Sequence, residues 1–208
     1  MPGYELIDAK EKKALTDLFK NPIDIIGNKK IKSFEKAIKS TLKSKYCQVV
    51  TSGTAATKIA LKAIGIKPGD EVITQAFNFI ATVEAIYELG AKPIIVNVDD
   101  SLNMNPDDLK KKITSKTRAI IPVHMLGVPC DMLSIMKIAK ENRIAVIEDN
   151  CESMGAKINN KHLGTIGDAG ILSFDGGKTI TTGEGGAIIT NNKNIYKYCN
   201  EYHDHGHE

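Results

Sequence analysis

Short apolar runs alternate with amphipathic helical patterns along most of the chain. After a polar, helical start, the apolar runs predict strands at residues 46–51, 71–74, 93–98, 118–123, 144–148, 170–174 and 186–190. Apolar positions at helical spacing predict helices at residues 54–64, 79–89, 106–113, 132–142 and 193–202. The strand runs are rich in Val and Ile and nearly continuous, as in strands buried on both faces. The pattern predicts an α/β fold with a mostly parallel, seven-stranded sheet flanked by helices.

Composition narrows the class of protein. The chain has 208 residues, 42% of them hydrophobic, which is enough for one good-sized core. The net charge of +3 comes from lysines scattered over predicted helix faces, so we expect no nucleic-acid partner. The N-terminus lacks the layout of a signal peptide, and no apolar run has the length of a membrane span. Four cysteines without a Cys-x-x-Cys pair indicate reduced thiols in a cytoplasmic protein.

Polar residues follow the first predicted strand, where ligands bind in such folds. The run from Thr51 to Ala56 places Ser52, Gly53 and Thr54 at the start of a helix. Hydroxyls and free backbone amides at a positive helix end form a phosphate site. Taken alone, the same run also fits an ordinary helix cap, which is the commoner case.

Two further strand ends carry candidate groups. Asp149 follows Glu148 after the fifth strand, where a carboxylate can hold the proton of a pyridine ring nitrogen, as in a pyridoxal phosphate site. A helix cap or a metal carboxylate fits equally. Phe79 follows the second strand and could lie on a flat ring, although a phenylalanine on a helix more often belongs to the core.

Lys178 lies in a Gly-rich bend between the last two predicted strands, within residues 173–186. A lysine amine beneath a pocket can form a Schiff base with a carbonyl compound. A single lysine on a loop is usually only solvated, so the interpretation depends on the motifs elsewhere in the chain.

Six motifs together carry a family resemblance. They occur in one order at residues 52–56, 77–82, 124–127, 148–152, 164–168 and 173–186. With them the chain resembles the sugar aminotransferases of the DegT/DnrJ/EryC1/StrS family, which are fold-type I pyridoxal phosphate enzymes. The resemblance covers about residues 4–206. It implies a pyridoxal-phosphate-binding large domain over residues 1–208, with an N-terminal segment over about 1–45 and an α/β core over about 46–208.

The resemblance implies roles residue by residue. Lys178 matches the Schiff-base lysine and Asp149 the partner of the pyridinium nitrogen, and both would be catalytic. Phe79 matches the aromatic that stacks on the ring. The phosphate ligands of the family fall on Gly53, Thr54 and Ser173. Glu152 falls near the cofactor hydroxyl, where the family usually has Gln or His, and a carboxylate there would repel a phenolate-like oxygen.

The resemblance also implies an activity. An amino donor, expected to be glutamate, would give its amine to a keto-sugar, which could be nucleotide-linked or of the octulosonate type, for cell-surface polysaccharide. Residues 1–6, 178–181 and 204–207 resemble the 8-amino-3,8-dideoxy-octulosonate transaminases within the family. Alternatives are a sugar dehydratase on the same scaffold, although that branch has His in place of Lys178, and a non-catalytic cofactor-binding domain.

Two expectations concern what accompanies this domain. Family members are homodimers and continue into a small C-terminal domain, so we expect this chain to be the large domain without the small one. The tract of His203, His205 and His207 could suggest a metal, but alternate residues do not share a helix face. We therefore expect no metal site.

Overall fold

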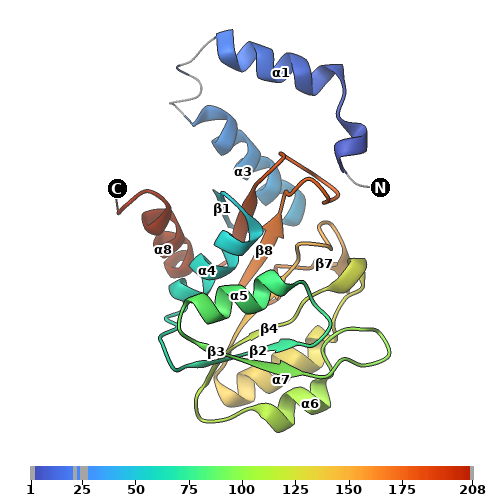
Figure 1. The fold of residues 1–208 in the computed structure, drawn as a ribbon, viewed down its shortest axis with the longest axis vertical. Helices are drawn as coiled ribbons and strands as arrows, with labels where there is room; N and C mark the ends of the chain where they lie inside the picture. The colour runs from blue at the N-terminus through green and yellow to red at the C-terminus, as the bar shows by residue number, and fades with distance from the viewer. Residues whose placement is uncertain (1–2, 21–22, 24–27, 207–208) are drawn as a thin grey trace.

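One seven-stranded sheet forms the centre of the molecule (Figure 1). The computed structural model describes residues 3–20, 23 and 28–206, so Met1, Pro2 and His207 of the motifs above lie outside the described residues. The strands lie in the order β1-β9-β8-β5-β4-β2-β3. Their bounds are Tyr46–Val50 (β1), Glu71–Gln75 (β2), Lys92–Val96 (β3), Thr117–Ile121 (β4), Ala145–Asp149 (β5), Ala169–Ser173 (β8) and Gly186–Thr190 (β9). Among the described strands of this sheet, β9 runs opposite to the other six, which confirms the mostly parallel α/β fold.

Helices cover both faces of the sheet. Their bounds are Ala9–Lys20 (α1), Lys29–Leu42 (α3), Gly53–Ala63 (α4), Ile80–Glu88 (α5), Pro106–Lys112 (α6), Met132–Asn142 (α7) and Lys193–His203 (α8). Short 3-10 helices occur at Gly3–Leu6 (η1) and Met125–Gly127 (η2). One face packs against α4, α5 and α8, and the other against α3, α6 and α7. Each predicted strand and helix is present, with its ends shifted by at most two residues.

Local sequence signals explain where the helices begin. Asn105 caps α6 through its side-chain oxygen, and a proline occupies the first turn, where no amide partner is needed. Asp131 caps α7 by accepting from the Ser134 amide at 3.1 Å. Asn192 does the same for α8. These three helices therefore start where a short polar side chain satisfies their first amides, whereas α3 and α5 have no side-chain cap.

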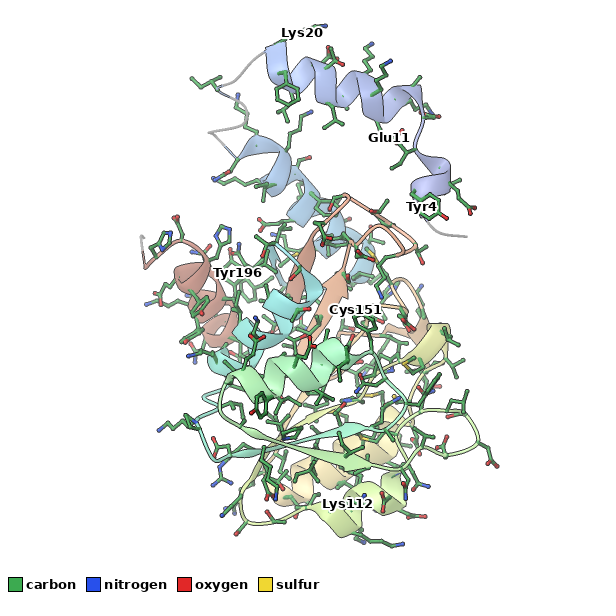
Figure 2. The ribbon with its side chains drawn as sticks, viewed as in Figure 1. Tyr4, Glu11, Lys20, Lys112, Cys151 and Tyr196 are labelled. Atoms are coloured by element: carbon green, nitrogen blue, oxygen red, sulfur yellow. The ribbon has the colours of Figure 1, made fainter. Side chains whose placement is uncertain are left out.

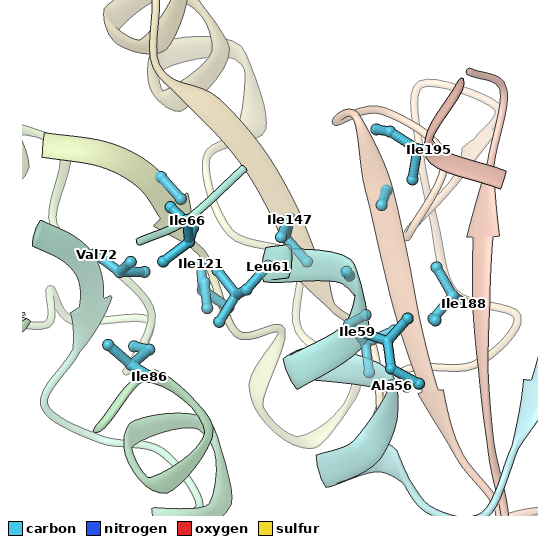
Figure 3. Packing of buried hydrophobic residues seen from close by; sticks show 14 of the residues in the cluster. Ala56, Ile59, Leu61, Ile66, Val72, Ile86, Ile121, Ile147, Ile188 and Ile195 are labelled. Atoms are coloured by element: carbon cyan, nitrogen blue, oxygen red, sulfur yellow. The ribbon is translucent and has the colours of Figure 1, made fainter. Parts of the chain in front are cut away.

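The largest apolar cluster lies between the sheet and α4, α5 and α8. Figure 3 shows Ala56 and Ile59 of α4 facing Ile188 of β9, with Leu61 close to Ile121 of β4. Ala56 and Leu61 have no exposed surface. Because a fully buried Leu or Ile contributes about 1.5–3 kcal/mol, this cluster fixes α4 firmly on the sheet.

The structure differs from the sequence pattern at the margins of the sheet. The strand β3 is an edge strand, so Lys92 is exposed and Ile95 retains 39% of its accessible surface. Burial on both faces, predicted for all strands, is wrong here. A two-stranded hairpin of β6 (Lys157–Ile158) and β7 (Lys161–His162) was not predicted. Its strands are too short to give a periodic pattern.

The sheet register brings distant strand ends together. Val50 at the end of β1 and Ser173 at the end of β8 both pair with Gly186. Asp149 at the end of β5 pairs with Ile171, two residues before Ser173. A Cβ atom on Gly186 would lie 2.3 Å from the Ser52 carbonyl oxygen, so the start of α4 can approach β9 only over a glycine. Residues that follow β1, β5 and β8 therefore share one edge.

The N-terminal segment extends from this core. Figures 1 and 2 show α1 separated from the sheet, with Glu11 and Lys20 on it. Its apolar residues Leu15 and Phe19 are 59% and 72% exposed. Near the N-terminus, the Gly3 amide donates to the carbonyl of Lys178 at 2.7 Å. The segment thus contacts the lysine loop while leaving apolar surface uncovered.

Candidate functional site

A pocket of about 320 Å³ lies at the shared strand edge. Residues from the ends of β1, β5 and β8 and from the starts of α4 and α5 contribute to it. Its lining consists of Ser52, Gly53, Thr54, Thr57, Phe79, Ala81, Thr82, Val123, Met125, Asp149, Cys151, Glu152, Ser173, Asp175, Lys178 and Glu184. The volume lies within the range of small-molecule sites. Figure 2 shows Cys151, one of the lining residues, in the middle of the molecule.

The first turn of α4 forms one wall. Ser52 is the cap, and its hydroxyl accepts from the Ala55 amide at 3.1 Å. The Ala56 amide bonds to the Ser52 carbonyl at 3.0 Å. The amides of Gly53 and Thr54 come first in the helix, where no intrahelical acceptor exists. These two amides and the positive end of the helix dipole favour an anion at this wall.

Gly53 is packed closely against Ser173 at the end of β8 and against Cys151, which follows β5. A Cβ atom at Gly53 would lie 3.0 Å from the Ser173 Cβ and 3.2 Å from the Cys151 sulfur. A larger residue would push these neighbours apart. The absence of a side chain therefore allows the Ser173 hydroxyl to lie beside the start of α4, as a phosphate site would require.

Asp149 projects into the pocket from the end of β5 and is only 7% exposed. The Thr82 hydroxyl donates to its Oδ2 at 2.8 Å, and the Cys151 amide donates to its Oδ1 at 3.2 Å. The carboxylate is thus held between α5 and the turn after β5. Burial raises the pKa of the Cys151 thiol well above its ordinary value, and the nearby Asp149 charge raises it further. The thiol is therefore protonated at neutral pH.

Lys178 reaches the same pocket from the loop between β8 and β9. Its Nζ lies 3.6 Å from Glu152 Oε1 and 5.8 Å from the centre of the Phe79 ring. The other Glu152 oxygen accepts from the Leu126 amide at 3.2 Å. Phe79 is 66% exposed and precedes α5, so it is not a core residue. Its ring forms part of the pocket mouth.

All seven residues singled out from the sequence line this one pocket: Gly53, Thr54, Phe79, Asp149, Glu152, Ser173 and Lys178. Their roles toward a cofactor stay predictions. Sequence reasoning assigned nothing to Thr82, although it lies in the motif at residues 77–82, three positions after Phe79. Only its place on the first turn of the following helix could have suggested that it faces the pocket. The ion pair between Glu152 and Lys178 was not predicted either.

Glu148 points away from this pocket and has no exposed surface. It accepts from the amides of Gly164, Ile166 and Gly167 at 2.6–2.9 Å. His124 Nε2 lies 3.1 Å from it, while His124 Nδ1 accepts from the Cys130 amide. The Nε2 atom therefore carries the proton and donates to Glu148. Of the paired carboxylates, Glu148 holds a loop and Asp149 faces the pocket.

No group of three or more His, Cys, Asp or Glu side chains within residues 3–20, 23 and 28–206 is arranged to hold a metal ion. In the same ranges, no helix has the length and apolar character needed to cross a bilayer.

Comparisons with known proteins identify the family of the chain. The model of the DegT/DnrJ/EryC1/StrS aminotransferase family matches residues 5–208. A GDP-perosamine synthase of Escherichia coli O157:H7 is 44% identical over 177 residues, which are 85% of this chain and 49% of that protein. The chain spans about half the length of such curated relatives.

Solved structures share the fold. An aminotransferase from Psychrobacter cryohalolentis superposes with a TM-score of 0.90 at 33% identity, covering 96% of this chain and 51% of the other. A GDP-4-keto-6-deoxymannose-3-dehydratase with a trapped PLP-glutamate geminal diamine gives a TM-score of 0.80 at 36% identity, covering 85% and 47%. By its sequence match and its fold, the chain belongs to the DegT/DnrJ/EryC1/StrS aminotransferase family.

Proposed function

We propose that the pocket binds pyridoxal 5′-phosphate and that the chain forms the cofactor-binding large domain, residues 1–208, of a sugar aminotransferase. One observation carries the proposal. A lysine amine, a buried carboxylate and a helix N-terminus flanked by hydroxyls converge on one pocket from separate strand ends. These groups suit an aldehyde, a ring nitrogen and a phosphate, which are the three functional groups of this cofactor. The solved relative that carries PLP supports the choice.

Each group has a separate task. When bound, pyridoxal phosphate provides an electron sink for charge that develops on the carbon next to an amine. The amides of Gly53 and Thr54 and the Ser173 hydroxyl would hold the phosphate. Phe79 would cover one face of the ring, and Asp149 would keep a proton on the ring nitrogen. Lys178 would hold the cofactor through Nζ, and the same amine would then take a proton from the α-carbon of the donor.

Glu152 would act on Lys178 more than on the cofactor. Its Oε1 lies 3.6 Å from Nζ. The carboxylate can therefore form an ion pair with the protonated lysine whenever the amine is not bound to cofactor. Its second oxygen is already engaged by the Leu126 amide. Pairing with Lys178 would explain why this chain has a carboxylate, Glu152, where the family resemblance places the cofactor hydroxyl.

For substrates we propose glutamate as the amino donor and a nucleotide-linked keto-sugar as the acceptor, in the synthesis of a cell-surface polysaccharide. The donor would leave as its keto acid, and the sugar carbonyl would become an amine. The similarity to GDP-perosamine synthase supports a nucleotide-linked sugar, and an octulosonate-type sugar is the alternative acceptor. A homodimer is the proposed assembly.

A sugar dehydratase is the second candidate, because a dehydratase is among the solved structures with high similarity. That branch of the family has histidine where this chain has Lys178. The two activities differ in product, since a dehydratase releases water from the sugar and leaves no amine on it. Mass spectrometry of the sugar product separates them.

The test begins with the absorption spectrum of the chain mixed with pyridoxal phosphate. A band at long wavelength that borohydride abolishes is expected, with the pyridoxyl group on Lys178 in the peptide map. Lys178→Ala should lose the band, whereas Lys161→Ala, at an exposed lysine, should keep it. Label on another lysine would disprove the assignment. Binding without release of 2-oxoglutarate from glutamate would indicate a non-catalytic cofactor-binding domain.

A further inference from the structure

The two oxygens of Asp149 receive different donors. The Cys151 amide, which reaches Oδ1, belongs to the backbone and is present whatever side chain follows. The donor to Oδ2 is the hydroxyl of Thr82 at 2.8 Å. Both partners are buried, at 3% exposed for Thr82 and 7% for Asp149. In such surroundings a charge-assisted hydrogen bond is strong, and a carboxylate oxygen left without its donor is costly.

Thr82 occupies a position that links two parts of the pocket. It lies in the first turn of α5, and its amide bonds to the carbonyl of Phe79 at 3.2 Å. Its hydroxyl then spans from α5 to the end of β5. By contrast, the Thr57 hydroxyl in α4 bonds only to the carbonyl of Gly53, four residues back in its own helix. Threonine commonly makes that local bond, so the contact between Thr82 and Asp149 is specific to this site.

We propose that Thr82 is a positioning residue for Asp149. This inference rests on the proposed function, because it concerns how the pocket would treat the cofactor ring nitrogen. A hydroxyl that donates to a carboxylate favours its ionised form and fixes its rotation. The two hydrogen bonds thereby fix how the Asp149 carboxylate faces the pocket. The Thr82 side chain also sets the distance between the Phe79 turn and Asp149. The cofactor ring would therefore be positioned both by Phe79 on its face and by Asp149 at its nitrogen.

The experiment compares Thr82→Val, which removes the hydroxyl at constant shape, with Thr82→Ser, which keeps it. Thr190→Val is the matched control. Thr190 is also buried, at 4% exposed, and its hydroxyl donates to the Asp168 carbonyl at 2.6 Å, away from the pocket lining. Three quantities are measured on the 208-residue chain: the melting temperature without cofactor, the dissociation constant for pyridoxal phosphate, and the pH dependence of the bound cofactor's absorption.

Thr82→Val should weaken cofactor affinity about tenfold, equal to about 1.4 kcal/mol. It should also shift the pH dependence of the absorption band, which a purely structural role would leave in place. Thr82→Ser should restore both to within about twofold of the unaltered chain. Thr190→Val should lower the melting temperature and leave the affinity unchanged. If Thr82→Val fails to fold, Thr82→Ala replaces it, because it differs from Thr82→Ser by the hydroxyl alone.

A double-mutant cycle shows whether Thr82 acts through Asp149. In an Asp149→Asn background, Thr82→Val should cause no further loss of cofactor affinity. An equal loss in both backgrounds, or an unchanged affinity and pH dependence in Thr82→Val, would overturn the inference. An unaltered chain that shows no cofactor band would instead count against the proposed function, so the two failures are distinguishable.

Discussion

Neighbouring carboxylates on β5 have opposite surroundings because successive side chains of a strand point to opposite faces. Glu148 accepts three backbone amides and the His124 ring, all buried. Asp149 accepts a hydrogen bond from the Thr82 hydroxyl and lines the pocket. By position after the apolar run, either acid could serve as the ring-nitrogen partner, and the family resemblance pointed to Asp149. The strand alternation and the loop at residues 164–167 decide between them.

Glu148→Gln should destabilise the fold. A glutamine offers one oxygen, so its NH₂ group would face either the amides of Ile166 and Gly167 or the Gly164 amide and the His124 ring N–H. A buried donor facing donors costs about 1–3 kcal/mol, and more where a charged group was bound. We expect a loss of about 3 kcal/mol in urea unfolding. Glu141→Gln, at an exposed position, is the control and should change the unfolding free energy by less than about 0.5 kcal/mol. Equal stability of the two variants would contradict this account.

Ser173→Ala tests the proposed phosphate site. The Ser173 hydroxyl lies beside Gly53, and a Cβ at that glycine would be 3.3 Å from Ser173 Oγ. Removing it takes away a contact that ground state and transition state share, so cofactor affinity should fall about tenfold while the rate at saturating cofactor stays within about twofold. Titration and single-turnover measurements give the two numbers. A slower reaction at unchanged affinity would disprove the role.

At the scale of residues, sequence reasoning found the groups that follow strands and missed those that face them from helices. Asp149 and Ser173 could be predicted because they end apolar runs. Thr82 was missed, because its place on the first turn of a helix was the only signal and the apolar pattern assigns such a residue to the helix alone. Glu152 was placed near the pocket, but its contact with Lys178 depends on a long loop whose path the pattern does not encode.

Among the elements, α7 offers a clean test of capping. Asp131→Ala removes the cap bond to the Ser134 amide and should destabilise the chain by about 1 kcal/mol. The Ser134 hydrogen bonds hold the pKa of Asp131 below its ordinary 3.8. A lowered folded-state pKa means that this stability is full above about pH 4 and is lost as the pH falls further. The difference between Asp131→Ala and the unaltered chain, measured by urea unfolding, should therefore shrink from pH 6 to pH 3. A constant difference would show that the charge of Asp131 is irrelevant.

The elements and the mostly parallel course of the strands were predictable, and the reversed direction of β9 was not predicted. Val/Ile runs and helical spacing located each strand of the large sheet and the helices between them. The antiparallel course of β9 could have been inferred from the helix-free connection at residues 174–185, since parallel crossovers usually contain a helix. The hairpin of β6 and β7 turns at Asn159 and Asn160, both with positive φ, and this Asn-Asn pair was an available turn signal.

At the scale of the whole molecule, the N-terminal segment exposes a group of apolar side chains, here called the N-terminal apolar surface. We define it as Tyr4, Leu6, Ile7, Leu15 and Phe19, each at least 56% exposed. Exposed apolar groups gathered on one segment are typical of contact surfaces. We expect a second copy of the chain to cover them in the proposed homodimer.

The double variant Leu15→Glu and Phe19→Glu should therefore weaken self-association by at least about tenfold, because each buried side chain of this size contributes about 1.5–3 kcal/mol. Sedimentation velocity over a range of concentrations measures it. Leu133→Glu, on α7 and 81% exposed, is the control and should leave the association unchanged. A chain that stays monomeric at all concentrations would end the dimer proposal for these 208 residues.

The pairing of β1 with β9 has a consequence for the order in which the chain folds. Within the part of the chain that the structure describes, β1 comes first among the sheet strands, and its sheet partner is β9, which comes last among them. On a ribosome the N-terminal part emerges first, so the backbone groups of β1 that bond to β9 would stay unpaired until β9 has been synthesised. Long-range pairings of this kind close slowly. In pulse-labelled refolding, the amides of Gln48 and Val50 should gain protection together with those of β9 and after those of β4, because the intervening Val49 amide donates to the Glu35 side chain and not to β9.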